Sequence, residues 1–500
     1  MKRTRSLLII LLAAVLAVLL SSCISITVTK AETAHEAAEE PAEAQEPEPA
    51  PSEDKPEKPD YAAGLFDHSY VHTAEIWLSA EDWEDLLNNP TEKTKYDATI
   101  TLDGEDAGEI YIATKGHSSL FFVAAMGDST RYSFKITFGG NDKKKTFHGL
   151  RKLNLNNSFA DATFVKDYLC YWLFEKMGVA APRASFVWVI VNGEPQGLYT
   201  AVDEVNGKFL KRVFGDDGPL YEPEHESMNA ELIEEMKNGE SAHSEDELEG
   251  ADLVYIDDDP AHYPDIFDNA ETDDDEETQA LVIRALKALN EREDLESYVD
   301  TEAVIRYFAV HNYLVNFDSY TGPMLHNFYL YVRNGRLSLI PWDYNLAFGT
   351  FSPDGVVTNW TEGWRAVNQG IDSPLSGTPA TEEDRPMWSW IVADEKYRAE
   401  YHDALDEMIS EYFETGEMAG ELDRVYDMIY MFVEHDPTSF FTLSEFETAY
   451  GTLREVVLRR AESIRKQLDG GLATVTEEQQ EEDRIDASDI DISTMGSPAE

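Results

Sequence analysis

Apolar residues between positions 70 and 202 fall in short runs separated by turn residues, a pattern typical of β-strands. The dipeptides Asp103-Gly104 and Asn192-Gly193 each separate two such runs and favour two-residue hairpin turns, because both central residues need a positive φ. Ser79 followed by Asp82 predicts the start of a short helix. Strands are predicted at residues 73–78, 99–102, 109–112, 132–138, 153–155, 186–191 and 198–202.

Other apolar residues recur every three to four positions, which is the period of amphipathic helices. One helix is predicted at residues 164–177, and further stripes begin at Leu281 and Val304. Three more helices follow towards the C-terminus, and the last is predicted to open on a capping box of Ser444 and Glu447. The chain is therefore expected to be rich in strands first and in helices later, which is an α+β arrangement.

A third hairpin is predicted near residue 335. The apolar runs 328–332 and 337–340 flank Asn334-Gly335, which is the strongest short-range signal for a two-residue turn. Pairing of Arg333 with Arg336 would fix the register of the two strands. The residues just outside the strands would then meet at the open end of the hairpin.

Three polar residues are expected at that open end. In the predicted register Asn327 lies opposite Trp342, so Asn327 and Asp343 come together, and the preceding loop can bring Asp318 over the same end. Two carboxylates and one amide suit Mg²⁺ or Mn²⁺ with phosphate oxygens. A loop Asp, an Asn that opens a strand and a later Asp also follow the order of a kinase active site. The simpler alternative is that all three residues only cap turns and strand ends.

The segment IPWDYNLAFG, with HNFYLY before it, resembles the signature of the CotH-type spore-coat kinases, a family of atypical secreted protein kinases. The run RKLNLNNSFADATFVKDYLCYWLFEKMGVAAPRASF strengthens the resemblance. It implies a kinase-like two-lobed α+β fold with a β-rich N-terminal lobe and a helical C-terminal lobe. It also implies a monomeric phosphotransferase that uses ATP and Mg²⁺ or Mn²⁺ on a protein serine or threonine. Asp318 would orient the acceptor hydroxyl, and Asn327 and Asp343 would hold the metal.

Four further residues are candidates for binding the nucleotide. Lys135, on a predicted strand, is expected to reach the phosphates as the strand lysine of kinases does, unless it is simply solvated. Asp167, on the helix that follows, is the candidate acid to pair with Lys135. Glu204 is expected near the adenine, or else exposed at a strand end. Ser118 follows Gly116 in a turn whose backbone amides can face phosphate, although most such turns bind nothing.

The chain departs from these patterns in three places. Protein kinases place four residues between the catalytic Asp and the metal-binding Asn, whereas eight residues separate Asp318 from Asn327, and Asn316 is the nearest substitute. Asn345 stands where many relatives have a second acid, and Leu120 stands where an Arg usually follows the glycine turn. A non-catalytic surface adhesin on the same fold, with or without bound Ca²⁺, is therefore the alternative.

The 500-residue chain is strongly acidic, with 98 Asp and Glu against 40 Lys and Arg and a formal net charge of −58. Nucleic acid binding is disfavoured, because little positive charge is left to neutralise phosphates. Such a charge suits solubility outside a cell, or a basic partner. Only Cys23 and Cys170 are present, which excludes a disulfide framework. Cys170 lies in an apolar run and is expected to be a buried free thiol.

The N-terminus carries an export signal. A basic start precedes the apolar run 7–20, which has the length of a signal peptide. Leu20-Ser21-Ser22-Cys23 resembles a bacterial lipoprotein box. The resemblance implies cleavage before Cys23 and a lipid on its thiol, which would anchor the exported protein to the outer face of the cell membrane. An ordinary secretory signal with an incidental cysteine is the alternative.

These patterns divide the chain into consecutive regions. An acidic insertion at residues 222–278 is predicted to be a solvated loop; its aspartate runs 257–259 and 273–275 lack the spacing of a Ca²⁺-binding loop. A Ca²⁺ site or a contact for a basic protein substrate is the alternative there. The regions are a signal peptide (1–22), a disordered tether rich in Ala, Glu and Pro (23–65), a kinase-like domain (70–350), a helical C-terminal lobe (351–470) and a disordered acidic tail (474–500).

Overall fold

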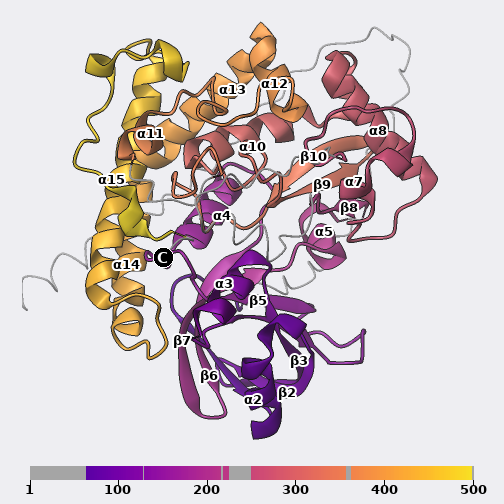
Figure 1. Ribbon diagram of the computed structural model, residues 1–500, viewed down its shortest axis with the longest axis vertical. Helices are drawn as coiled ribbons and strands as arrows, with labels where there is room; N and C mark the ends of the chain where they lie inside the picture. The colour runs from indigo at the N-terminus through magenta and orange to yellow at the C-terminus, as the bar shows by residue number, and fades with distance from the viewer. Residues whose placement is uncertain (1–63, 128, 216–217, 225–248, 356–361, 498–500) are drawn as a thin grey trace, which may run out of the picture. The chain divides into compact units, whose positions relative to one another are not determined.

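A computed structural model describes residues 64–127, 129–215, 218–224, 249–355 and 362–497. These residues form an α+β structure in which a β-barrel precedes a largely helical part (Figure 1). The predicted α+β class is confirmed, while the pair of kinase-like lobes stays a prediction. Among the described helices, none has the length and apolar character needed to cross a membrane. The predicted signal peptide, Cys23 and nearly all of the tether lie outside the described residues.

The strands of the first part close into a barrel with the neighbour order β1-β2-β3-β4-β5-β7-β6. Neighbours are antiparallel except for β1 and β6, which run parallel where the barrel closes. Both predicted turns are confirmed, with positive φ at Asp103, Gly104, Asn192 and Gly193. The strands are β1 (His72–Trp77), β2 (Tyr96–Leu102), β3 (Glu105–Lys115), β4 (Ser133–Phe138), β5 (Lys152–Asn156), β6 (Ala184–Val191) and β7 (Glu194–Asp203).

A small sheet of order β10-β9-β8 carries the third predicted hairpin. Its strands are β8 (Leu220–Tyr221), β9 (Phe328–Arg333) and β10 (Arg336–Pro341). Arg336 pairs with Arg333 as predicted, and positive φ angles at Asn334 and Gly335 make the turn. The turn chemistry therefore sets the register that brings residues 327 and 342 together.

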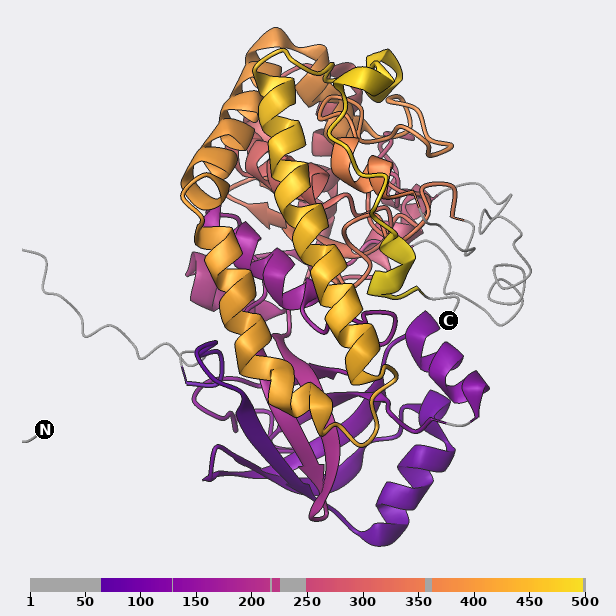
Figure 2. The ribbon, with the colours of Figure 1, turned by 90° about the vertical axis from the view of Figure 1, so that its left-hand side faces the viewer.

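Helices dominate the second half of the chain, where α14 and α15 run side by side (Figure 2). The helices of the first half of the chain are α2 (Ala80–Asn88), α3 (Ser118–Met126), α4 (Lys166–Lys176) and α5 (Gly207–Phe214). The later helices are α7 (Pro264–Phe267), α8 (Glu276–Glu291), α9 (Leu295–Tyr298), α10 (Thr301–Leu314), α11 (Gly363–Asn368), α12 (Pro386–Ala393), α13 (Glu395–Met408), α14 (Glu417–Glu434) and α15 (Leu443–Leu468). Short 3-10 or π turns are η1 (Pro90–Glu92), η2 (Pro260–His262), η3 (Ile409–Phe413), η4 (Thr476–Glu478), η5 (Glu481–Asp483) and η6 (Ile492–Met495).

The barrel and the helical part have separate apolar cores. Alternation along β4 sends Phe134 and Ile136 into the barrel interior. Helix α4 belongs to the other core, where it contacts α10. Residues 168–174 of α4 are buried on every side, which explains why this run is apolar at every position rather than along one stripe. Cys170 lies in this helix as a buried free thiol, as predicted.

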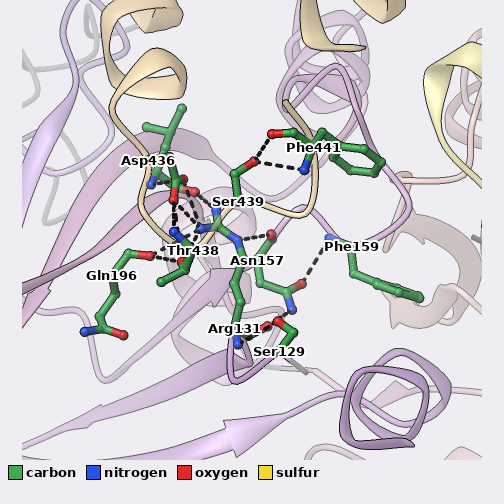
Figure 3. A network of polar contacts seen from close by, with 10 residues as sticks. Ser129, Arg131, Asn157, Phe159, Gln196, Asp436, Thr438, Ser439 and Phe441 are labelled. Carbon is green, nitrogen blue, oxygen red and sulfur yellow. Dashed lines mark hydrogen bonds and ion pairs between the residues drawn. The ribbon is translucent and has the colours of Figure 1, made fainter. Parts of the chain in front are cut away.

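A buried ion pair ties the connection between α14 and α15 to the barrel (Figure 3). Arg131, just before β4, donates from Nη1 to both carboxylate oxygens of Asp436, at 3.0 and 2.9 Å. Both side chains are fully buried. Arg131 also donates to the carbonyl group of Asn157 at 2.9 Å, and Asp436 accepts the N–H of Leu198 at 2.8 Å. Gly197 (φ 109°) is required beside the pair, because a Cβ there would overlap the Asp436 carboxylate.

The prediction of a disordered tail is wrong for residues 474–497. Ile492 and Met495 are fully buried, and η6 packs against α15. Met495 accepts the N–H of Ala162 through its carbonyl oxygen at 3.1 Å, which connects the tail to the loop before α4. Apolar residues placed between the acids provide this packing. A chain that ended at residue 473 would lose it.

Three smaller expectations also differ from the structure. The fold begins earlier than Tyr70, because Leu65 and Phe66 are already buried against the barrel. The capping box of α15 is formed by Thr442 and Glu445, two residues before the predicted one. Residues 249–278 of the acidic insertion are not simply a solvated loop, since they carry α7 and bury apolar side chains in the helical core, namely Ala251, Leu253, Tyr263 and Ile266.

Candidate active site

A cavity of about 820 Å³ lies between the barrel and the β9-β10 hairpin. One wall is the outer face of β3, β4, β5 and β7. Because side chains alternate along each strand and paired residues share a face, side chains from alternate positions of these strands, together with Glu204 just after β7, line the cavity. The residues of this wall are Tyr111, Ala113, Lys115, Ser133, Lys135, Thr137, Lys152, Asn154, Asn156, Thr200 and Glu204.

Asp318, Asn327 and Asp343 line the opposite wall of the same cavity. Trp342 donates its N–H to the carbonyl oxygen of Asn327 at 3.2 Å, so the hairpin register holds at its open end. The Asn327 side chain donates to Asp318, at 2.7 Å to the carbonyl oxygen and 3.0 Å to Oδ2. Burial raises the pKa of Asp343; the charge of Lys115 opposes this rise and that of Asp318 adds to it. The structure thus gathers the three predicted residues at one place.

His326 is a member of this wall that the sequence interpretation missed. Its Nε2 lies 2.9 Å from Oδ1 of Asp318. Burial alone would lower the pKa of His326, but the Asp318 carboxylate, together with the charges of Glu224 and Asp343, raises it. Both carboxylate oxygens of Asp318 therefore have partners, and its orientation is fixed. The position next to Asn327 was the signal that could have identified His326.

Lys135 pairs with Glu204, and the predicted pair of Lys135 with Asp167 is wrong. The Glu204 carboxylate lies 3.0 Å from Nζ of both Lys135 and Lys152, and Asn154 donates to it at 2.7 Å. Burial alone would raise the pKa of Glu204, but the two ammonium groups and the amide together lower it to about 2. Glu204 is therefore the buried acid that holds the strand lysine.

Asp167 lies instead beside Asp343, at the start of α4. It accepts hydrogen bonds from Nδ2 of Asn156 at 2.8 Å and from the N–H of Tyr344 at 2.9 Å. Burial and the nearby Asp343 charge raise its pKa to about 7. Lys115, which the sequence interpretation also missed, donates to Oδ1 of Asn156 at 2.8 Å. Burial lowers the pKa of Lys115 despite its acidic neighbours.

The remaining candidates are less central. Ser118 lines the cavity as the first residue of α3, so the predicted open turn is reduced to Gly116 and His117. Asn316 accepts the N–H of Asp318 at 3.1 Å and is not among the residues that line the cavity. Asn345 lines it but donates to the carbonyl group of Phe159 at 3.3 Å.

The donor set of the cavity fits magnesium or manganese. Within the described ranges, no three or more His, Cys, Asp or Glu side chains are arranged to enclose a metal by themselves. Mg²⁺ rarely uses such a cage; it is usually held by one or two carboxylates together with water and substrate phosphates. Asp343 and Asn327 would supply that smaller number of oxygens. ATP phosphates would have to complete the shell.

Glu204→Gln is expected to remove a pH-dependent part of the stability. The folded-state pKa of about 2 lies below the usual 4.5, so the charged Glu204 stabilises the fold above pH 4.5. This contribution, about 3 kcal/mol, is lost as the pH falls towards 2. The gap in unfolding free energy between wild type and variant should therefore shrink from pH 6 to pH 3 in urea titrations. Glu194→Gln, an exposed change at the start of β7, the strand that precedes Glu204, is the control. An equal gap at both pH values would contradict the ion-pair account.

Comparison with known proteins gives a consistent set of matches. A family model described as "CotH kinase protein" matches residues 112–464. The inner spore coat protein H of Bacillus subtilis (strain 168) is 21% identical over 345 residues, which is 68% of this chain and 84% of that protein. An inner spore coat protein H-like protein of the same strain is 38% identical over 56 residues, which is 11% of this chain and 18% of that protein. The family match includes Asp318, Asn327, Asp343, Lys135 and Glu204 from the two walls of the cavity, and it ends before the C-terminal tail.

Proposed function

The chain belongs to the CotH kinase protein family, and on this premise we propose that it is a metal- and ATP-dependent phosphotransferase whose acceptor is a protein serine or threonine. One observation carries the proposal: Asp318, Asn327, Asp343 and the Lys135–Glu204 pair line a single cavity. These are the residue types that position phosphates, a metal and an acceptor hydroxyl in phosphoryl transfer. The kinase-like division into a β-rich and a helical lobe is part of the same proposal.

Two groups of side chains would bind the nucleotide from opposite walls. Asn327 and Asp343 would hold Mg²⁺ or Mn²⁺, which neutralises charge on the phosphates when bound. Lys135 would donate to phosphate oxygens from the barrel wall. Glu204 holds Lys135 in place at 3.0 Å, while Lys152 shares the same carboxylate and stays beside it. Catalysis would then come from positioning and electrostatics.

Asp318 would orient the acceptor. The acceptor oxygen forms a bond to the γ-phosphorus, the bond to the β–γ bridging oxygen breaks, and ADP leaves. The hydroxyl proton passes to the Asp318 carboxylate. His326 and Asn327 contact one oxygen of Asp318 each, at 2.9 and 3.0 Å, which fixes the direction of the carboxylate. A loose phosphoryl-transfer transition state needs orientation of the hydroxyl more than strong proton abstraction.

Binding of nucleotide tests the first half of the proposal. ATP with Mn²⁺ should raise the unfolding temperature of the full-length protein, whereas ATP with a chelator should not. Lys135→Met should weaken ATP about tenfold, because a hydrogen bond to a charged group is lost. Lys145→Met, a change in an exposed pair with Glu109, is the control for the lost charge. Absence of any response of the wild type to ATP with metal would refute the function.

We also propose a location and partners for this activity. Lipidation of Cys23 after export would anchor the protein to the outer face of the membrane, as the lipoprotein box implies. The tether would hold the catalytic region away from the surface, where it would act as a monomer on a protein substrate. Labelling with a radioactive fatty acid, lost in Cys23→Ala, tests the anchor.

A further inference from the structure

Asp343 has a backbone conformation that needs support. Its φ of 46° lies in the left-handed region, which is less favourable than the right-handed one for residues other than glycine, although Asp tolerates it better than most. The support comes from α4. The N–H of Asp343 donates to the hydroxyl of Tyr171 at 2.9 Å, and the next N–H, that of Tyr344, donates to Oδ1 of Asp167 at 2.9 Å. The two acceptors are one helical turn apart on the same face of α4.

Both acceptors are themselves held firmly. Asp167 is buried, and its second oxygen accepts Nδ2 of Asn156 at 2.8 Å. Asn156 accepts in turn from Lys115 at 2.8 Å, so strands β3 and β5 determine the rotamer of Asp167. Tyr171 is 2% exposed and packs edge-on against the ring of Tyr344. Neither acceptor can turn towards solvent without breaking these contacts.

Helix α10 holds the other end of Tyr344. The Tyr344 hydroxyl lies 2.8 Å from Nδ1 of His311, and Nε2 of His311 lies 2.8 Å from the Thr321 hydroxyl. Thr321 belongs to the loop that carries Asp318. All three side chains are buried. The backbone at residues 343–344 is therefore fixed from two helices, and α10 connects it to the Asp318 loop.

We infer that Asp167 and Tyr171 are positioning residues that aim the Asp343 carboxylate at the metal by accepting two successive backbone N–H groups. The inference rests on the proposed function and refines it. Asp167 therefore does not pair with Lys135; it holds the turn that follows β10. Without the two hydrogen bonds the left-handed turn would relax, and the carboxylate would swing away from Asn327.

Helix α4 offers a matched pair of variants. Tyr171 and Tyr168 are three residues apart, each is 2% exposed, and each hydroxyl has a partner. The Tyr168 hydroxyl contacts Glu421 and Arg424, away from the cavity. Tyr171→Phe should raise the Mn²⁺ dissociation constant about tenfold, as loss of such supporting contacts does in metal sites. Tyr168→Phe should leave the Mn²⁺ dissociation constant unchanged. Both variants should lower the unfolding temperature by similar amounts, because each loses one hydrogen bond of a buried tyrosine.

The measurement is Mn²⁺ binding followed by electron paramagnetic resonance, with ATP present, and it needs no turnover. Asp167→Ala should weaken Mn²⁺ binding as Tyr171→Phe does. Asp167→Asn should restore only part of the affinity, because its Oδ1 still accepts the N–H of Tyr344 but its Nδ2 faces the Nδ2 donor of Asn156. Equal Mn²⁺ affinity in Tyr171→Phe, Tyr168→Phe and wild type would overturn the inference. An equal loss of Mn²⁺ affinity in Tyr171→Phe and Tyr168→Phe would also overturn the inference. A wild type that binds no Mn²⁺ with ATP would refute the proposed function itself.

Discussion

Asp343→Asn is expected to lower phosphoryl transfer by about 10²- to 10³-fold, the usual cost of removing one charged contact to a transition state. The change keeps the size of the side chain and removes its charge. Asp343 lines the cavity at the open end of the hairpin beside Asn327, so the loss should fall on metal use. The rate should be followed over a range of Mn²⁺ concentrations. A high Mn²⁺ concentration should restore part of the lost rate.

The control for this variant is Asp384→Asn. Asp384 also lines the cavity but is exposed, and its carboxylate closes a turn onto the N–H of Thr381 at 2.7 Å. Asp384→Asn removes the same charge from the cavity and leaves Asp318, Asn327 and Asp343 unchanged. If both variants lose activity equally, the effect comes from the general charge of the cavity, and the metal role of Asp343 is wrong.

Asp436→Ala is expected to destabilise the fold by about 3–5 kcal/mol, because it leaves the buried guanidinium of Arg131 without its counter-charge. The pair is fully buried and joins the α14–α15 connection to β4 and β7. The alanine also removes the acceptor of the Leu198 N–H. Denaturant titration of the full-length protein measures the loss.

Asp423→Ala is the matched control for this stability effect. Asp423 pairs with Arg454 at 3.2 Å on the surface of α14 and α15, and it is 65% exposed. Exposed pairs of this kind contribute about 0–1 kcal/mol. Equal losses in the two variants would mean that the buried pair does not tie the helices to the barrel.

Local turn chemistry explains how much of the fold could be predicted. Asp103-Gly104, Asn192-Gly193 and Asn334-Gly335 each fix a two-residue turn, and the strands on either side followed from period-two alternation. The same logic placed Asn327 beside Asp343, because the register of a hairpin depends only on its turn. These parts of the site depend on neighbours in sequence.

Long-range pairing explains what was missed. Glu204 meets Lys135 because β5 lies between β4 and β7 in the barrel, and no local pattern reveals that order. Lys115 and His326 also take their roles from chains of contacts that span the cavity. Asp167 was predicted to pair with Lys135 by analogy with kinases, but the order of strands in the barrel brings Glu204 to Lys135 instead. The analogy identified the lysine but not its acidic partner.

Charge also misled the interpretation of the C-terminus. Residues 474–497 are strongly acidic, yet Ile492 and Met495 are fully buried among their neighbours. A few apolar residues at the right spacing are enough to pack a segment onto a helix already in place. Net charge describes the solvent-facing side of such a segment and says little about the side that packs.

Transfer of labelled γ-phosphate from ATP tests the central claim most directly. The full-length protein would be incubated with ATP and Mg²⁺ or Mn²⁺, alone and with a casein-like substrate, and the label on serine and threonine measured. The account predicts metal-dependent label that Asp318→Asn and Asp343→Asn both strongly reduce. Metal-dependent ATP binding by the wild type without any transfer of label would contradict it, and would identify a nucleotide-binding protein without kinase activity.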